Sequence, residues 1–235
     1  MRRAIEFFWG SIEYRINPKG RAWGGGGPFN GQVKRRELVE SLVEHFAIDT
    51  VVETGTYYGV TADYFSNVLH LETITIESNS RFAGFSAARL RNTKNANVVV
   101  ADSRDALRTI IPKLGARNRV LFYLDAHCDN DDLHPLPQEL EIIFGLMHNP
   151  IVLIDDFAVP FDSGYNFDVY KSGLELKLDF IMQEIIKFNL CVFFPSAPSS
   201  GESGPRRGSV MLCHNCDATA MEGVSQARRW HEKVG

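Results

Sequence analysis

The sequence predicts an α/β protein with a doubly wound, mostly parallel sheet of seven strands, the last of which runs antiparallel. Three observations predict this fold class. Short apolar segments alternate with segments of helical periodicity along most of the 235 residues. Each apolar segment is rich in β-branched residues, as strands are when helices cover both faces of a parallel sheet. The final two apolar segments are joined by a loop alone, which indicates antiparallel pairing.

The predicted elements follow one another in a regular order. The first helix is indicated by Leu38, Leu42 and Phe46, which recur at helical spacing. The predicted helices are residues 36–46, 61–69, 81–91, 103–111, 136–147 and 174–188. The predicted strands are residues 50–53, 73–76, 97–100, 120–124, 151–154, 191–194 and 208–213.

Length and composition favour one main domain. With 44% apolar residues, the chain can bury one sizeable core. We expect this domain at residues 35–216, after an N-terminal arm or lid at 1–34 and before a polar C-terminal tail at 217–235. In the arm, glycines and a proline from Gly24 to Pro28 exclude regular structure. Residues 29–32 either close over a ligand or cap the edge of the sheet.

Charge and hydropathy exclude some partners. The net charge is −4, and the 25 basic residues are spread along the chain, so nucleic acid is not an expected partner. No apolar run approaches about 18 residues, and Glu6 interrupts the apolar start, so we expect neither a membrane span nor a signal peptide. The sequence therefore predicts a cytoplasmic protein without a membrane partner. It does not fix the oligomeric state, and a homodimer is compatible with it.

The four cysteines predict neither a disulfide framework nor a zinc site. They are too few and too scattered to staple a chain of this length. Cys213 and Cys216 have the spacing of half a zinc site, but no second pair of cysteine or histidine ligands follows with a comparable pattern. Chance spacing at the end of a strand explains this pair.

A glycine-bearing turn follows the first predicted strand. Glu53 closes that strand, and Gly55 and Gly59 lie in the turn before the next helix. Open α/β sheets bind ligands at this place, with one glycine for the tight turn and another for close approach to the ligand. The spacing is G-x-x-x-G, not the G-x-G-x-x-G of dinucleotide folds. A carboxylate before the first glycine suits a cationic amino group better than a phosphate.

The next two strands also end in polar residues. Glu77 closes its strand about 24 residues after Glu53, where such folds hydrogen-bond a ribose diol. Asp102 and Ser103 follow the third strand and suit an exocyclic amino group or a ring nitrogen. Three consecutive strand ends are therefore compatible with adenosine, although each one alone is equally compatible with a solvated strand end.

These residues resemble a known family. The pattern consists of Glu53, Gly55, Tyr57, Gly59 and Thr61 at alternate positions, then Glu77, then Asp102 and Ser103. It resembles the class I S-adenosylmethionine-dependent methyltransferases, and most closely the metal-dependent O-methyltransferases of the catechol type and the sugar O-methyltransferases of macrolide biosynthesis. The resemblance covers about residues 35–215 and implies a Rossmann-like methyltransferase fold.

The resemblance also implies a cofactor and its ligands. The cofactor is S-adenosylmethionine. Glu53 and the turn from Gly55 to Gly59 would hold its methionine part, Glu77 the ribose hydroxyls, and Asp102 with Ser103 the adenine. The implied cofactor-binding residues are Glu53, Thr54, Gly55, Thr56, Tyr57, Gly59, Glu77, Ser78, Asp102, Ser103 and Asp125.

Carboxylates follow the fourth and fifth predicted strands. Asp125 comes after residues 120–124, and Asp155 and Asp156 follow residues 151–154. Three like charges at one edge require a cation, and oxygen ligands favour Mg²⁺, or Mn²⁺ or Ca²⁺, over zinc. The resemblance agrees, because the metal-dependent O-methyltransferases place metal ligands at these positions. The alternative is that Asp125 and Asp155 are ordinary strand-end caps, one of which meets the cofactor or substrate.

The chemistry expected of this site is O-methylation. Asp125 and His127 are the candidate catalytic residues, with His127 as the base that removes the acceptor proton and His134 as a rival. The catechol-type pattern has a lysine after the metal aspartate, so the sequence departs from the family here. For Asp129, Asp131 and Asp132 a solvated loop is the expected setting.

Each of two further segments has two possible roles. The aromatic loop at 157–170 is either an acceptor wall or a surface flap, and Arg206 and Arg207 either neutralise an acidic acceptor or face water. The expected acceptor is the hydroxyl of a small molecule such as a sugar or polyol. The alternative functions are a nucleotide-binding module without catalysis and a nicotinamide-dependent oxidoreductase.

Overall fold

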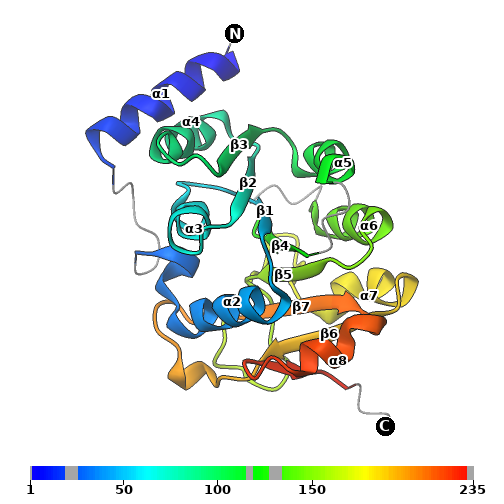
Figure 1. Ribbon diagram of the computed structural model, residues 1–235. Helices are drawn as coiled ribbons and strands as arrows, with labels where there is room; N and C mark the ends of the chain where they lie inside the picture. The colour runs from blue at the N-terminus through cyan, green and yellow to red at the C-terminus, as the bar shows by residue number, and fades with distance from the viewer. Residues whose placement is uncertain (1, 19–25, 115–118, 127–133, 232–235) are drawn as a thin grey trace.

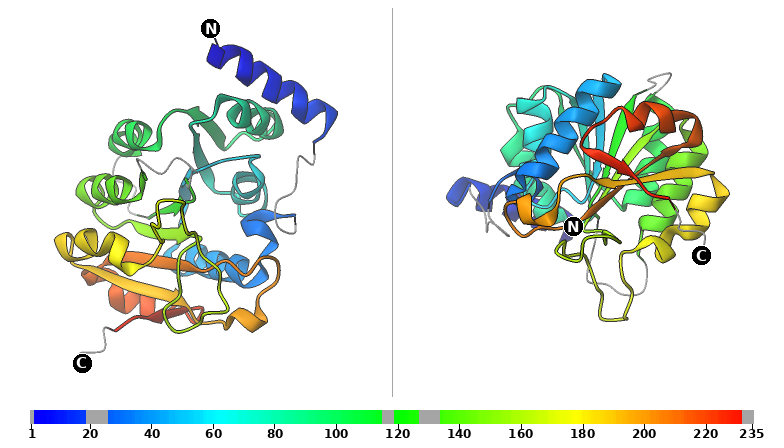
Figure 2. Two further views of the ribbon diagram at one scale, coloured as in Figure 1. Left: turned by 180° about the vertical axis from the view of Figure 1, so that it is seen from behind. Right: turned by 90° about the horizontal axis from the view of Figure 1, so that it is seen from below.

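The computed structural model describes residues 2–18, 26–114, 119–126 and 134–231. These residues form one eight-stranded sheet between two layers of helices (Figure 2). The strands are β1 Thr50–Thr54, β2 Glu72–Glu77, β3 Ala96–Val100, β4 Val120–Leu124, β5 Ile151–Asp155, β6 Leu190–Pro195, β7 Ser209–His214 and β8 Ala227–Arg229. The α-helices are α1 Arg2–Ile16, α2 Val33–Phe46, α3 Val60–Asp63, α4 Ser80–Leu90, α5 Ser103–Leu114, α6 Leu136–Leu146, α7 Leu178–Lys187 and α8 Ala218–Glu222. None of the helices in these ranges is long and apolar enough to span a membrane.

The strand order is β3-β2-β1-β4-β5-β7-β6-β8 (Figure 1). The first five strands are parallel to their neighbours among themselves, whereas β7 runs antiparallel between β5 and β6. This confirms the predicted doubly wound, mostly parallel sheet with an antiparallel strand near its end. The chain passes from β1 outward to β2 and β3 and resumes on the other side of β1 at β4. The ends of β1 and β4 therefore form the switch point at which such sheets bind ligands.

Two apolar cores lie on opposite faces of the sheet. Val52, Phe122 and Ile154 belong to the core beneath α5, α6 and α7. Val51 and Tyr123 belong to the core beneath α2 and α8. Neighbouring residues of one strand serve opposite cores because side chains alternate along a strand. Both faces are therefore buried, which explains why the strands are almost entirely apolar in sequence.

Two helices differ from their predicted extents. The helix predicted at 61–69 is divided into α3 and a π-helical turn, Tyr64–Val68. The helix predicted to begin at 174 begins at Leu178. Before it, the Leu176 N–H donates to the Asp168 carbonyl at 3.0 Å, and the Leu176 carbonyl accepts from the Ala158 N–H at 2.8 Å. Residues ahead of α7 are thus extended because they pair with the loop that follows β5.

The described parts of the N-terminal segment are held against the body. Helix α1 lies along α4 (Figure 1). Phe29 is only 2% exposed and contacts the rings of Tyr64, Phe65 and Tyr123, with centroid distances of 5.6, 5.5 and 5.5 Å. Residues 29–32 were expected either to close over a ligand or to cap the edge of the sheet. Phe29 is buried within the core. The glycines at 24 and 25 lie outside the described residues.

The polar C-terminal segment also contributes to the body. Met221 in α8 is fully buried, and Val224 is 1% exposed. Strand β8 then pairs antiparallel with β6 and forms the edge of the sheet. Few apolar residues mark this segment in the sequence, which is why the eighth strand was not predicted.

Candidate functional site

Gly55 brings the ends of β1 and β4 together. Its φ is +84°, and a Cβ atom there would lie 2.2 Å from the carbonyl oxygen of Asp125. The Asp125 N–H in turn donates to the Thr54 carbonyl at 2.9 Å. Only glycine satisfies both the left-handed backbone and this close approach. The predicted turn therefore lies at the switch point, directly beside the residue that follows β4.

Gly59 has a different neighbour from the one expected. Its φ is +72°, and a Cβ atom there would lie 2.8 Å from the Cβ of Ser86 on α4. The missing side chain thus allows α4 to approach closely, whereas the turn pattern predicted close approach of a ligand. Whether the Gly59 backbone also contacts a cofactor stays a prediction.

Glu77 ties the turn to the end of β2. Its Oε2 accepts from the Tyr57 N–H at 2.8 Å, and its Oε1 accepts from the Asn79 N–H at 2.8 Å. Burial raises the pKa of Glu77, although these backbone donors oppose the rise. Each carboxylate oxygen retains a lone pair for a further donor, such as a hydroxyl group of a ligand. The next residue, Ser78, is exposed at the same strand end.

Glu53 lies beneath the turn and is 2% exposed. Its carboxyl accepts a hydrogen bond from the Thr75 hydroxyl, which also bonds to the Thr56 hydroxyl. Burial raises the pKa of Glu53 to about 8, so the group is mostly protonated at neutral pH. The polar contact of its carboxyl is with Thr75 of the protein itself. Its contact with the methionine part of a cofactor stays a prediction.

The third strand end is organised by Arg104. Asp102 accepts from the Arg104 backbone N–H at 3.0 Å, from Nε at 2.8 Å and from Nη2 at 2.7 Å. Hydrogen bonding to Arg104 lowers the pKa of Asp102, so this carboxylate is ionised. Ser103 begins α5 and is 7% exposed. Asp102 and Ser103 thus lie at the predicted edge, with Asp102 already paired.

Glu139 is a buried acid that sequence reasoning missed. It lies on α6, is 1% exposed, and has the hydroxyls of Thr54 and Ser103 beside it. Burial raises the pKa of Glu139 to about 7, against the opposing effect of these hydroxyls. The available signal was its place at helical spacing between Leu136 and Ile143, on the apolar side of the predicted helix.

Asp155, a predicted metal ligand, is fully engaged by protein groups. It is 1% exposed, and Oδ1 accepts from Arg35 Nη1 and from the Asp156 N–H at 2.7 Å. Its Oδ2 accepts from the Tyr123 hydroxyl. Burial alone would raise the pKa of Asp155, but the charge of Arg35 and the hydrogen bonds outweigh it and lower the pKa. This ion pair joins α2, β4 and β5 inside the protein.

Arg35 and Tyr123 were also missed in the sequence. The signal for Arg35 was its place three residues before Leu38, in line with the apolar side of the predicted helix, which in the structure begins earlier, at Val33. The signal for Tyr123 was a hydroxyl group within an otherwise apolar strand. A buried hydroxyl and a buried guanidinium both require partners, and Asp155 serves both.

Asp156 is paired with a second arginine. Its φ is +55°, and its Oδ1 accepts from Arg207 Nε at 2.6 Å. Arg207 also forms an ion pair with Asp168. Burial and the charge of Asp155 raise the pKa of Asp156 to about 7 even so. Arg207 was expected either to neutralise an acidic acceptor or to face water. In the structure it pairs with carboxylates of the protein itself.

These pairings bear on the predicted Mg²⁺ site. Arginines bind both Asp155 and Asp156, and among the residues that the structure describes no group of three His, Cys, Asp or Glu side chains is arranged to hold a metal ion. The described side chains therefore do not fit a divalent cation. The other acidic residues considered, Asp129, Asp131 and Asp132, lie outside the described residues.

The candidates for a catalytic base have different settings. Asp125 is partly exposed, and burial together with the charges of Asp155 and Asp156 raises its pKa well above the usual range. His127 lies outside the described residues. His134 contacts the rings of Tyr170 and Phe180, with centroid distances of 4.7 and 5.3 Å. Asp125 is therefore the candidate that the described structure places at the switch point.

The loop after β5 packs largely onto the body. Phe157 is fully buried, and Val159 and Tyr165 are 5% and 3% exposed. Phe161 is more exposed, at 44%, and lies beneath the guanidinium of Arg228 at 4.4 Å. These contacts favour the surface-flap interpretation for this part of the loop. Asp168, near its end, reaches the acidic edge through Arg207.

Comparison with known proteins shows the fold. No protein-family model matches the sequence, and no curated protein matches it. The chain is similar to the O-methyltransferase from Bacillus cereus in complex with S-adenosylhomocysteine, with 14% identity, a TM-score of 0.54, and coverage of 92% of this chain and 91% of that one. It is also similar to a cofactor-bound protein from MTB, with 14% identity, a TM-score of 0.51, and coverage of 91% and 89%.

A third similar structure is the methyltransferase domain of bacterial CtHen1-CN, with 11% identity, a TM-score of 0.51, and coverage of 77% of this chain and 97% of that one. At such identities the likeness concerns the fold and not the activity. The chain thus has the Rossmann-like methyltransferase fold that the sequence resemblance implied.

Proposed function

We propose that this protein is an S-adenosylmethionine-dependent methyltransferase that methylates a hydroxyl group of a small molecule, such as a sugar or polyol. One observation carries the proposal. The turn around Gly55 lies at the switch point of the sheet, and Glu77 holds it through the Tyr57 N–H at 2.8 Å. A rigid, glycine-bearing turn with a carboxylate beside it is suited to a nucleoside that carries a cationic amino acid.

Each strand end has a role in this proposal. The Gly55 backbone and the neighbouring Thr54 and Thr56 would hold the methionine part. Glu77, with Ser78 next to it, would accept hydrogen bonds from the ribose hydroxyls. Asp102 and Ser103 would hold the adenine, with Arg104 fixing the Asp102 carboxylate in place.

The chemistry places two demands on the protein. The cofactor supplies a methyl group activated by a positively charged sulfur. The protein must hold the acceptor oxygen in line with that methyl group, and it must take up the hydroxyl proton. Asp125 follows β4 with its backbone carbonyl beside Gly55, and its carboxylate is our candidate to take up this proton. His127 remains a second predicted base.

No step of this proposal uses a metal. Arg35 and Arg207 already supply positive charge to Asp155 and Asp156. The predicted Mg²⁺ dependence can be checked with a chelator. Loss of methyl transfer in EDTA and its recovery with Mg²⁺ would restore that prediction, because the arginines would then have to give way to the ion.

The test begins with cofactor binding. Isothermal titration with S-adenosylhomocysteine and with NADH should show binding of the first and none of the second. Transfer of a labelled methyl group from S-adenosylmethionine to a panel of sugars, polyols and phenols should follow. Binding of NADH alone would support a nicotinamide-dependent oxidoreductase. Binding of S-adenosylhomocysteine without transfer to any acceptor would support a nucleotide-binding module.

A further inference from the structure

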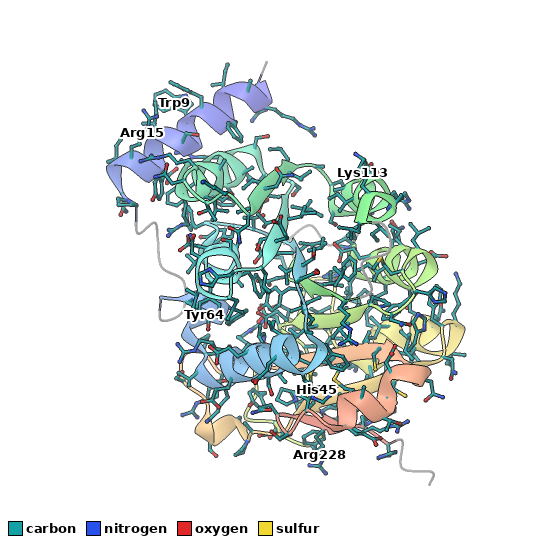
Figure 3. The ribbon with its side chains drawn as sticks, in the orientation of Figure 1. Trp9, Arg15, His45, Tyr64, Lys113 and Arg228 are labelled. Atoms are coloured by element: carbon teal, nitrogen blue, oxygen red, sulfur yellow. The ribbon has the colours of Figure 1, made fainter. Side chains whose placement is uncertain are left out.

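The outward side of α1 is apolar. Ile5, Phe8, Trp9 and Ile16 are 49%, 61%, 51% and 80% exposed. We call these four residues the α1 stripe. Their spacing places them on one side of the helix. Figure 3 shows Trp9 on the side of α1 that faces away from the body. Isolated exposed apolar residues are common, but four on one side of a helix form a shared apolar surface.

The inward side of α1 is fixed against α4. Cβ atoms at Gly10 and Gly84 would each lie 1.9 Å from a backbone oxygen of the opposite helix, so these glycines allow a very close crossing. The Ser11 hydroxyl donates to the Gly84 carbonyl at 3.0 Å, and Tyr14 contacts the Phe85 ring at 5.3 Å. The α1 stripe is therefore presented by a firmly docked helix.

The charges of α1 are divided between its two sides. Arg2 and Arg3 at its start and Arg15 at its end are exposed. The two acids of the helix, Glu6 and Glu13, interact with Arg81 of α4; hydrogen bonding and charge from Glu13, with the charge of Glu6, raise the pKa of Arg81. Exposed arginines therefore stand at both ends of the α1 stripe, whereas the carboxylates of the helix interact with α4.

We propose that α1 is an interfacial helix that binds the surface of an anionic lipid membrane. The α1 stripe would enter the boundary between headgroups and acyl chains, and Arg2, Arg3 and Arg15 would meet lipid phosphates. Helices with aromatic and aliphatic residues on one side and flanking arginines bind membranes in this way without crossing them. The sequence predicted no membrane partner because its pattern indicates neither a spanning segment nor a signal peptide, and an interfacial helix requires neither.

A second copy of the chain fits this surface less well. Two α1 helices packed stripe to stripe would bring arginines against arginines at both ends, whether they ran parallel or antiparallel. The acids of α1, Glu6 and Glu13, already interact with Arg81 of α4. One 15-residue helix also offers far less than the roughly 800 Å² per partner of a standard interface. Charge and size therefore favour lipid.

The experiment is co-sedimentation of the full chain with vesicles. One set contains phosphatidylcholine alone, and the other also contains phosphatidylglycerol. We expect binding to the anionic vesicles, weak binding to the neutral ones, and release at high salt. Phe8→Ser with Trp9→Ser should lower the affinity at least about tenfold. Arg2→Gln with Arg15→Gln should lower it roughly fivefold per arginine.

The control is Ile186→Ser on α7, because Ile186 is 72% exposed and far from α1 in the chain. This variant should bind anionic vesicles as the unchanged protein does. Thermal unfolding of all variants checks that each is folded. Absence of binding to anionic vesicles, or equal binding by the stripe variant, overturns the proposal. So does a dimer that the stripe variant converts to a monomer in light scattering, which would assign the stripe to a second copy.

Discussion

The two halves of the sheet edge bear similar carboxylates in different surroundings. In the half formed by β1 and β2, Glu53 and Glu77 are bound by hydroxyl and backbone N–H groups. In the half formed by β4 and β5, Asp155 and Asp156 are bound by arginines. With neutral donors, burial raises the pKa of both Glu53 and Glu77, whereas the charge of Arg35 lowers the pKa of Asp155. An acid at a strand end therefore does not by itself define a site.

The largest expected effect tests the arginine half. Arg35→Ala removes the cation beside buried Asp155 and should destabilise the protein by about 3–5 kcal/mol, because an uncompensated buried charge remains. Urea unfolding measures this change. The matched control is Arg36→Ala. The Arg36 side chain is 42% exposed, and its ion pair with Glu40, at 3.7 Å, lies at the surface. Its cost should stay below about 1 kcal/mol. Equal costs for the two variants would remove the distinction between the halves.

The next prediction concerns pH in the first half. The raised pKa of Glu53, about 8, means that the folded state keeps a proton that the unfolded state loses at lower pH. Stability should therefore fall as pH rises between the unfolded pKa, about 4.3, and about 8. Glu53→Gln should remove about 3–4 kcal/mol of this decline, measured as unfolding free energy at pH 5 and pH 8. An unchanged decline in the variant would show that Glu53 is not the group concerned.

Two glycines allow the cost of a left-handed backbone to be measured separately from the cost of a steric clash. Gly55 and Gly173 both have a φ of +84°, but a Cβ atom at Gly173 would meet nothing within 4 Å. Gly173→Ala should cost about 1 kcal/mol for the left-handed backbone. Gly55→Ala should cost about 2 kcal/mol more, because its Cβ meets the Asp125 carbonyl. Equal unfolding free energies for the two variants would mean that the switch point is not tightly closed.

The smallest effect is expected at Asp102. Its partner Arg104 is two residues away, and the Asp102 side chain is 41% exposed. Arg104→Ala should change the unfolding free energy by less than about 1 kcal/mol. It should also raise the pKa of Asp102 toward its usual value, which NMR titration can follow. A large loss of stability would place Asp102 with the arginine-bound carboxylates of the other half.

The same contrast explains what the sequence could predict. The central strands β1, β4 and β5 were predictable because they are buried on both faces, and the turn at Gly55 because its signal is local. Tyr57 and Glu77 are 20 positions apart, within one strand–helix–strand unit. Arg35 and Asp155 are 120 positions apart, and Arg207 and Asp156 are 51 apart. Neither pairing has a local signature, so three carboxylates at two strand ends suggested a metal where the structure has arginines beside two of them.

The central claim is that the β1–β2 side of the edge binds S-adenosylmethionine. Its most direct test is isothermal titration of S-adenosylhomocysteine into Glu77→Ala and Glu72→Ala. The two residues stand at opposite ends of β2, and Glu72 is exposed. Loss of a buried hydrogen-bonding carboxylate should weaken binding by roughly 10- to 100-fold in Glu77→Ala. Glu72→Ala should bind as the unchanged protein does. Equal affinity in both variants, or no binding by the unchanged protein, would contradict the claim.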